Sequence, residues 1–87
     1  MEFDWDEHNV AHTARHDVTP GDVEQALSDP NGLAVSARHF GGEQRVGFIG
    51  ATARGRVMVV IWTVRHNKVR VITARDASRK ERQLYTK

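Results

Sequence analysis

The 87-residue sequence predicts an α+β domain with two N-terminal helices, a four-stranded antiparallel sheet and a C-terminal helix. Three observations lead to this prediction. Two helix-start signals lie before Gly21, the apolar pattern changes to that of strands from Leu33 onward, and a capping-box spacing follows the last strand. The length is that of one domain, so residues 1–87 are expected to fold as a single unit.

The two N-terminal helices have different start signals. Asp6 is a favourable N-cap for a first helix over Glu7–Arg15. The second start combines an N-cap, a proline at the first helical position and an acid at the capping-box position: Thr19, Pro20 and Asp22. Apolar residues then recur at i, i+3 and i+4, which gives this helix one apolar face: Val23, Ala26 and Leu27. The turn-forming sequence Asp29-Pro30-Asn31-Gly32 ends it.

Four strands are expected in the following segment: Leu33–Arg38, Arg45–Gly50, Arg56–Val64 and Lys68–Ala74. His39–Gly42 is predicted to be a turn or loop, Arg54-Gly55 a turn, and His66-Asn67 a tight hairpin. The third strand is apolar on both faces and should therefore be central. Asp76 or Ser78 caps the last helix, and Ser78-x-x-Glu81 has the capping-box spacing.

Composition excludes several classes of protein. There is no cysteine, so disulfides, thiolate metal sites and cysteine nucleophiles are excluded. The longest apolar run, Val57–Trp62, is too short for a membrane span, and the acidic start Met1-Glu2-Phe3-Asp4 is unlike a signal peptide. A cytoplasmic protein with no membrane association is expected.

Charge is unevenly distributed along the chain. Residues 1–30 contain eight acids and one base, whereas residues 31–87 contain twelve bases and three acids. This asymmetry favours an anionic ligand at the C-terminal end. The alternative is that the two halves of the chain neutralise each other in the fold.

Several blocks resemble the BrnT family of toxins, whose fold is similar to that of the RelE ribonuclease toxins. The blocks are Phe3-x-Trp5-Asp6, Arg15-His16-Asp17-Val18-Thr19, Arg45-x-x-x-Ile49-Gly50, Gly55-Arg56-x-x-x-Val60-x-x-Thr63-x-Arg65, and Val69-Arg70-Val71-Ile72-Thr73-Ala74-Arg75 continuing to Glu81-Arg82 and Tyr85. Asp17 replaces the usual glycine and Pro20-Gly21 the usual Phe-Glu; Asp tolerates the left-handed conformation that glycine supplies there.

The resemblance implies an endoribonuclease that cleaves cellular RNA without a metal or cofactor and arrests growth. It also implies a partner, a BrnA-type antitoxin with a DNA-binding module, in a complex with two copies of each chain. A non-catalytic nucleic-acid-binding module and a toxin kept only for antitoxin binding are the alternatives. The RNA target, ribosome dependence and general base are left open.

Cleavage at the ribose 2′-OH needs a proton acceptor and positive charge on the phosphate. Histidine titrates near neutrality, and arginine binds phosphate oxygens. With His16 preferred over the loop histidines for the position that the resemblance gives it, the expected catalytic set is His16, Arg56, Arg75 and Arg79. The expected RNA-binding set is Arg45, Arg65, Arg70, Lys80 and Arg82. Because antiparallel pairing would separate Arg65 from Arg75, the favoured site combines Arg56, Arg75 and Arg79.

Each candidate has an alternative interpretation. His16 is equally well explained as a residue that caps the first helix, and any single arginine as a surface residue. Glu81 and Tyr85 are reserve candidates for the proton acceptor. His8, His12 and His16 recur at i, i+4 and i+8, but three histidines along one helix are too spread for one metal ion. Trp62 is expected in the core or facing a partner, and Trp5 is expected to pack the first helix onto the domain, rather than either stacking on bases.

Overall fold

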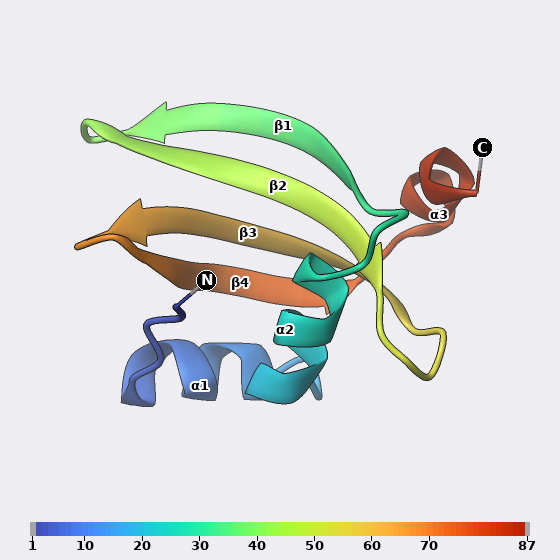
Figure 1. The fold of residues 1–87 in the computed structure, drawn as a ribbon, viewed down its shortest axis with the longest axis horizontal. Helices are drawn as coiled ribbons and strands as arrows, with labels where there is room; N and C mark the ends of the chain where they lie inside the picture. The colour runs from blue at the N-terminus through green and yellow to red at the C-terminus, as the bar shows by residue number, and fades with distance from the viewer. Residues whose placement is uncertain (1, 87) are drawn as a thin grey trace.

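The computed structural model describes residues 2–86, apart from the side chain of Phe40, and confirms the predicted fold class. Its elements are α1 (Glu7–Ala14), α2 (Pro20–Leu27), β1 (Leu33–Phe40), β2 (Glu43–Ala51), β3 (Val57–Arg65), β4 (Lys68–Asp76) and α3 (Arg79–Tyr85). The strands form one antiparallel sheet in the order β1-β2-β3-β4 (Figure 1). As predicted from its apolar faces, β3 lies inside the sheet.

Side-chain caps define the helix starts. The Asp6 carboxylate accepts hydrogen bonds from the backbone N–H groups of His8 and Asn9, and the Asn9 side chain accepts one from the N–H of Asp6. This capping box was not predicted, and α1 ends one residue before the expected Arg15. The predicted box at Thr19 is present, and Ser78 rather than Asp76 caps α3.

Three strands are longer than predicted, whereas β3 has the predicted length but begins and ends one residue later. β1 continues through His39 and Phe40, so the expected loop over His39–Gly42 is wrong for its first half. The reversal needs only Gly41 and Gly42, which have φ of 54° and 83°, values that glycine adopts without strain. The hairpin at His66 and Asn67 is confirmed, with φ of 52° and 62°, the left-handed values of a tight two-residue turn.

The helices lie on both sides of the sheet. α1 packs against β4 and α2 against β2 and β3, whereas α3 packs against the other face of β2, at one end of the sheet (Figure 1). The main core lies between the sheet and the helices α1 and α2, and it consists of Val18, Val23, Ala26, Met58, Val60, Val71 and Ala74. Ile49 and Val59 alternate with these core positions and are also buried, on the opposite face of the sheet.

Two features shape β4, a bulge in its pairing with β3 and a contact along its outer edge. The register shifts between Ile61 and Trp62, so that Ile72 is an extra residue between Val71 and Thr73. Nearer the start of β4, residues 2–4 run alongside the strand. There the Asp4 N–H donates to the carbonyl of Val69 and the Val69 N–H to that of Glu2, both at 2.8 Å. No helix within residues 2–86 is long and apolar enough to span a membrane.

Candidate functional site

Arg56 connects the turn between α1 and α2 to the end of β4. Its Nε lies 2.6 Å from the Asp76 carboxylate. Its terminal nitrogens donate to the backbone carbonyls of Asp17 at 2.7 Å and His16 at 3.0 Å. The Asp22 carboxylate lies 3.7 Å from the same guanidinium. With these contacts and a side chain only 20% exposed, Arg56 fixes the turn that carries His16.

Arg56 binds the Asp76 carboxylate, and the charges of Arg82 and His16 also act on it. The hydrogen bond from Arg56 holds the pKa of Asp76 below its usual value, and the nearby charges of Arg82 and His16 contribute to the shift. We call these four residues the Asp76 cluster. His16 follows the C-cap of α1, is exposed, and its ring contacts that of His12 with centroids 6.3 Å apart.

Arg75 and Glu81 form a separate pair on the other face of the sheet. The guanidinium donates to both carboxylate oxygens of Glu81, at 2.8 and 3.0 Å, and this pairing lowers the pKa of Glu81 to about 2. Arg75 is paired across the ladder with Val59, and Asp76 with the core residue Met58. Adjacent residues of a strand point to opposite faces, so Arg56 and Arg75 do not share one site.

The predicted RNA-binding arginines divide between the two ends of the sheet. Arg45 and Arg65 both contact Glu43 at the end opposite the Asp76 cluster, and the hydrogen bond from Arg65 is the main cause of the lowered pKa of Glu43. Arg70 reaches Asp4 at 3.4 Å and Asp6 at 2.9 Å. Its side chain is 14% exposed, so it anchors the N-terminal segment.

Part of the uneven charge along the sequence is neutralised in the fold, because acids from the N-terminal part of the chain form ion pairs with later bases. N-terminal acids bind C-terminal bases in the pairs Glu2–Lys68, Asp4–Arg70, Asp6–Arg70, Asp22–Arg54 and Asp22–Arg56. The alternative of mutual neutralisation is therefore correct for these residues. Within residues 2–86, the exposed bases that form no ion pair include three on α3: Arg79, Lys80 and Arg82.

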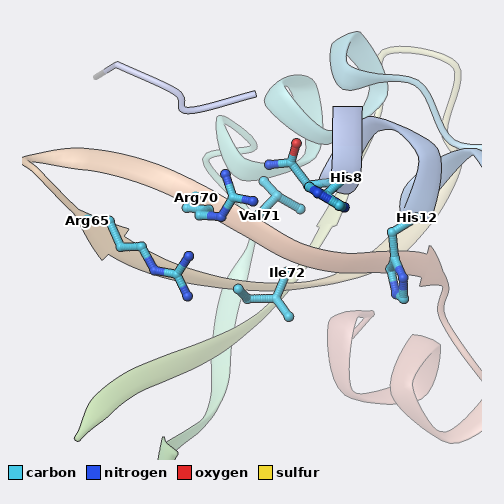
Figure 2. A pocket seen from close by; sticks show the side chains of 7 residues that line it. His8, His12, Arg65, Arg70, Val71 and Ile72 are labelled. Carbon is cyan, nitrogen blue, oxygen red and sulfur yellow. The ribbon is translucent and has the colours of Figure 1, made fainter. Parts of the chain in front are cut away.

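A hollow of about 220 Å³ lies beside β4, between α1 and the sheet (Figure 2). It is lined by His8, Asn9, His12, Arg65, Arg70, Val71 and Ile72. In the sequence, the histidines of α1 suggest only possible metal ligands, and nothing there places them beside arginines. The available signal was their i, i+4 spacing, which puts both rings on one face of the helix. The sequence does not show that this face packs against β4, because that contact depends on tertiary packing.

The remaining candidates have structural positions. The Trp5 indole donates to Glu24 at 2.9 Å and packs on the core, as expected. Trp62 also packs on the core, and its buried Nε1 has no hydrogen-bond partner among residues 2–86. The Tyr85 hydroxyl donates to Asp29 at 2.5 Å. No group of three histidine, aspartate or glutamate side chains in the described part of the chain is arranged to hold a metal ion.

The family comparison agrees with the resemblance noted in the sequence. A family model described as the ribonuclease toxin BrnT of a type II toxin–antitoxin system matches residues 5–81. The matched range contains α1, α2, the whole sheet, the Asp76 cluster except Arg82, and the start of α3. No curated protein gives a significant match. The chain belongs to the BrnT family of ribonuclease toxins of type II toxin–antitoxin systems.

Proposed function

We propose that this toxin cleaves cellular RNA in the cytoplasm without a metal ion, and that His16 is the proton acceptor for the attacking 2′-OH. The observation that carries the proposal is the Asp76 cluster, in which Arg56 binds Asp76 and the backbone carbonyls of the turn that carries the exposed His16. Histidine is the side chain that most readily accepts and donates protons near neutral pH.

The reaction needs one proton removed and one supplied. The proton of the ribose 2′-OH passes to the acceptor as the oxygen attacks the adjacent phosphorus and the bond to the 5′-oxygen breaks. The leaving oxygen takes a proton, which yields a 2′,3′-cyclic phosphate and a 5′-hydroxyl. Positive charge around the phosphate stabilises the extra negative charge of the transition state.

The exposed bases of α3 are the proposed phosphate ligands. Arg79, Lys80 and Arg82 form no ion pair with any residue of the range 2–86, so a phosphate that binds them displaces no bound carboxylate. Arg75 is less available to a phosphate, because its guanidinium already donates two hydrogen bonds to the Glu81 carboxylate. We therefore assign phosphate binding to Arg79 and Arg82 first, and to Arg75 only where an RNA phosphate displaces Glu81.

Arg56 has the role of a positioning residue. Two of its hydrogen bonds go to the backbone carbonyls of His16 and Asp17. Asp17 has φ of 57°, a left-handed conformation that reverses the chain directly after α1. Arg56 thus stabilises the turn that directs the imidazole of His16, rather than binding the substrate.

A toxin of a type II system is neutralised by a protein antitoxin. We propose that the partner is of the BrnA type, carries a DNA-binding module, and forms a complex with two copies of each chain that represses their promoter. Co-purification of the two chains, followed by a measurement of the mass of the complex, tests both the partner and the stoichiometry.

The test of the enzymatic proposal is to induce the toxin in a bacterial host with and without its antitoxin. Wild type is compared with His16→Ala, Arg79→Ala and Arg75→Ala, and with two control variants of exposed residues outside the site, His39→Ala and Arg54→Ala. Growth and total RNA integrity are followed together, and circular dichroism confirms that each variant folds. Cleavage by purified protein is repeated with and without EDTA.

We expect wild type and both controls to arrest growth and fragment RNA in either buffer, whereas folded His16→Ala and Arg79→Ala do not. Retained cleavage by His16→Ala would move the acceptor role to Glu81 or Tyr85. If cleavage stops in EDTA and returns with a divalent ion, metal independence is wrong. Folded wild type that binds RNA but never cuts it would support the binding-module alternative.

A further inference from the structure

We propose that the hollow beside β4 binds a phosphate of single-stranded RNA one step along the strand from the scissile bond. This subsite consists of His8, His12 and Arg65, with Ile72 beneath them. It rests on the proposed function above, because it extends the same strand of RNA away from His16. We call it the β4-edge subsite.

The lining of the hollow has the chemistry of an anion site. Four of its seven residues carry or can accept positive charge, and none is a carboxylate: His8, His12, Arg65 and Arg70. The acids that pair with the two arginines approach from outside it, Glu43 to Arg65 and Asp4 and Asp6 to Arg70. The lining that an anion would contact is therefore free of carboxylates, although Glu43, Asp4 and Asp6 lie close enough to act on Arg65.

Arg65 keeps donors available for a ligand. Its Nε binds Glu43, but neither terminal nitrogen forms a hydrogen bond with the described residues. The side chain is 43% exposed, and in Figure 2 its guanidinium points into the hollow, toward Ile72. Arg70 is different, because its two terminal nitrogens are bound to Asp4 and Asp6. Arg65 is thus the arginine able to grip a phosphate, and Arg70 forms part of the wall.

The histidines of α1 connect this hollow to the proposed catalytic residue. His8 and His12 are one turn apart on α1, and both line the hollow (Figure 2). Neither imidazole forms a hydrogen bond with a residue in the range 2–86, so their ring nitrogens can serve a ligand. His12 also contacts the ring of His16. His12 therefore borders both sites, and a strand bound in the hollow passes directly to His16.

The apolar floor suits a nucleotide rather than a bare ion. Ile72 is the extra residue of the β-bulge, and with Val71 it places hydrocarbon under the charged side chains. The hollow has room for roughly seven water molecules at about 30 Å³ each, more than a phosphate alone fills. A ribose can cover Ile72 while its phosphate meets Arg65 and the imidazoles.

The test measures binding without cleavage. The probe is an eight-nucleotide fluorescent RNA with 2′-O-methyl riboses, which has no 2′-OH to attack. Its dissociation constant is measured by anisotropy over a range of salt concentrations, using the full chain. The variants are Arg65→Gln, Arg65→Lys and His8→Gln with His12→Gln. The matched controls are Arg54→Gln, also an exposed arginine paired with an acid, and His39→Gln.

We expect Arg65→Gln to weaken binding roughly tenfold, and to flatten the slope of log K against log salt by about 0.7, the value for one phosphate contact on a single strand. Arg65→Lys should restore the slope, and both controls should match wild type. Unchanged affinity and slope in folded Arg65→Gln and in the double histidine variant would overturn the subsite while leaving the proposed function intact. If the variants lose binding but wild type never cuts natural RNA, the subsite stands and the proposed function fails. Wild type that does not bind the probe would overturn the subsite.

Discussion

Replacing Arg56 with alanine should strongly destabilise the fold. The change removes two hydrogen bonds from a charged donor to the carbonyls of His16 and Asp17, at 3.0 and 2.7 Å, each worth about 1 kcal/mol. It also removes the ion pair with Asp76, whose side chain is 64% exposed, so that pair adds at most about 1 kcal/mol. The free energy of unfolding should fall by about 2–3 kcal/mol, and Tm by about 10–20 °C for a domain of this size.

Urea and thermal unfolding followed by circular dichroism measure this effect. Arg54→Ala is the control, because Arg54 is 71% exposed and its single contact with Asp22, at 3.4 Å, is worth no more than about 0.5 kcal/mol. If Arg56→Ala shifts unfolding no more than Arg54→Ala, the positioning role is wrong. A phosphate-binding role would instead leave stability unchanged and reduce the salt dependence of RNA binding.

Three further perturbations test other parts of the structure. Because the pKa of Glu81 is about 2 in the fold and 4.5 in the unfolded chain, its pair with Arg75 stabilises fully above about pH 4.5. That stability, roughly 1–2 kcal/mol after allowance for the exposed arginine, is lost as the pH falls from 4.5 toward 2. Glu81→Gln should therefore remove this part of the acid dependence measured by urea unfolding, and an unchanged profile would contradict it. Tyr85 is the sole tyrosine, and its hydrogen bond to Asp29 raises its pKa, so absorbance titration should show ionisation above pH 10 that moves down in Asp29→Asn. A Cβ at Gly50 would lie 2.1 Å from the carbonyl oxygen of Ala26, so Gly50→Ala should cost about 1–3 kcal/mol or more. A Cβ at Gly21 would meet only the Thr19 hydroxyl oxygen, at an ordinary contact distance of 3.8 Å, so Gly21→Ala should be neutral or stabilising. Equal unfolding midpoints for the two variants would refute this.

Local signals explain why so much of the fold could be predicted. The boxes at Thr19 and Ser78 involve residues three apart, and the hairpin at His66 and Asn67 needs two adjacent left-handed residues. Each signal depends on groups that are close in sequence, so no knowledge of the tertiary structure is required. The central position of β3 follows similarly from its apolar residues on both faces.

Other features depend on contacts between distant segments. The bulge at Ile72 is set by the register of β4 against β3, which alternation alone does not show. The amphipathic pattern of α3 shows that the helix packs on one side, but not that it packs against β2 on the face opposite α1 and α2 (Figure 1). Capping of α1 by Asn9 was missed because asparagine is not the usual capping-box partner.

The candidate site was predictable by residue type but not by arrangement. His16 and Arg56 are indeed neighbours, yet the contact runs from the guanidinium to the backbone of His16 rather than to a shared ligand. Arg75 was expected beside Arg56 because both lie at the same end of a β-hairpin. Side chains alternate between the two faces along a strand, so a shift of one residue in the pairing of β3 with β4 would move Arg75 to the other face. The actual register pairs Arg75 with Val59, which places Arg75 on the face opposite Asp76 and its partner Arg56.

The ion pairs also change how a basic sequence should be interpreted. Twelve bases follow residue 30, but several hold N-terminal acids in place, and Arg70 is the clearest case because two aspartates bind its guanidinium. Such an arginine contributes to folding, and its loss would weaken RNA binding only by disturbing the fold. The bases that act on RNA should be those whose donors remain unused after folding, such as Arg79 and the terminal nitrogens of Arg65. A series of arginine variants should therefore separate into one group that lowers Tm and another that lowers the salt dependence of RNA binding, with little overlap between the two. A single group in which both quantities fall together would mean that folding and RNA binding use the same arginines, and that the assignment by unused donors is wrong.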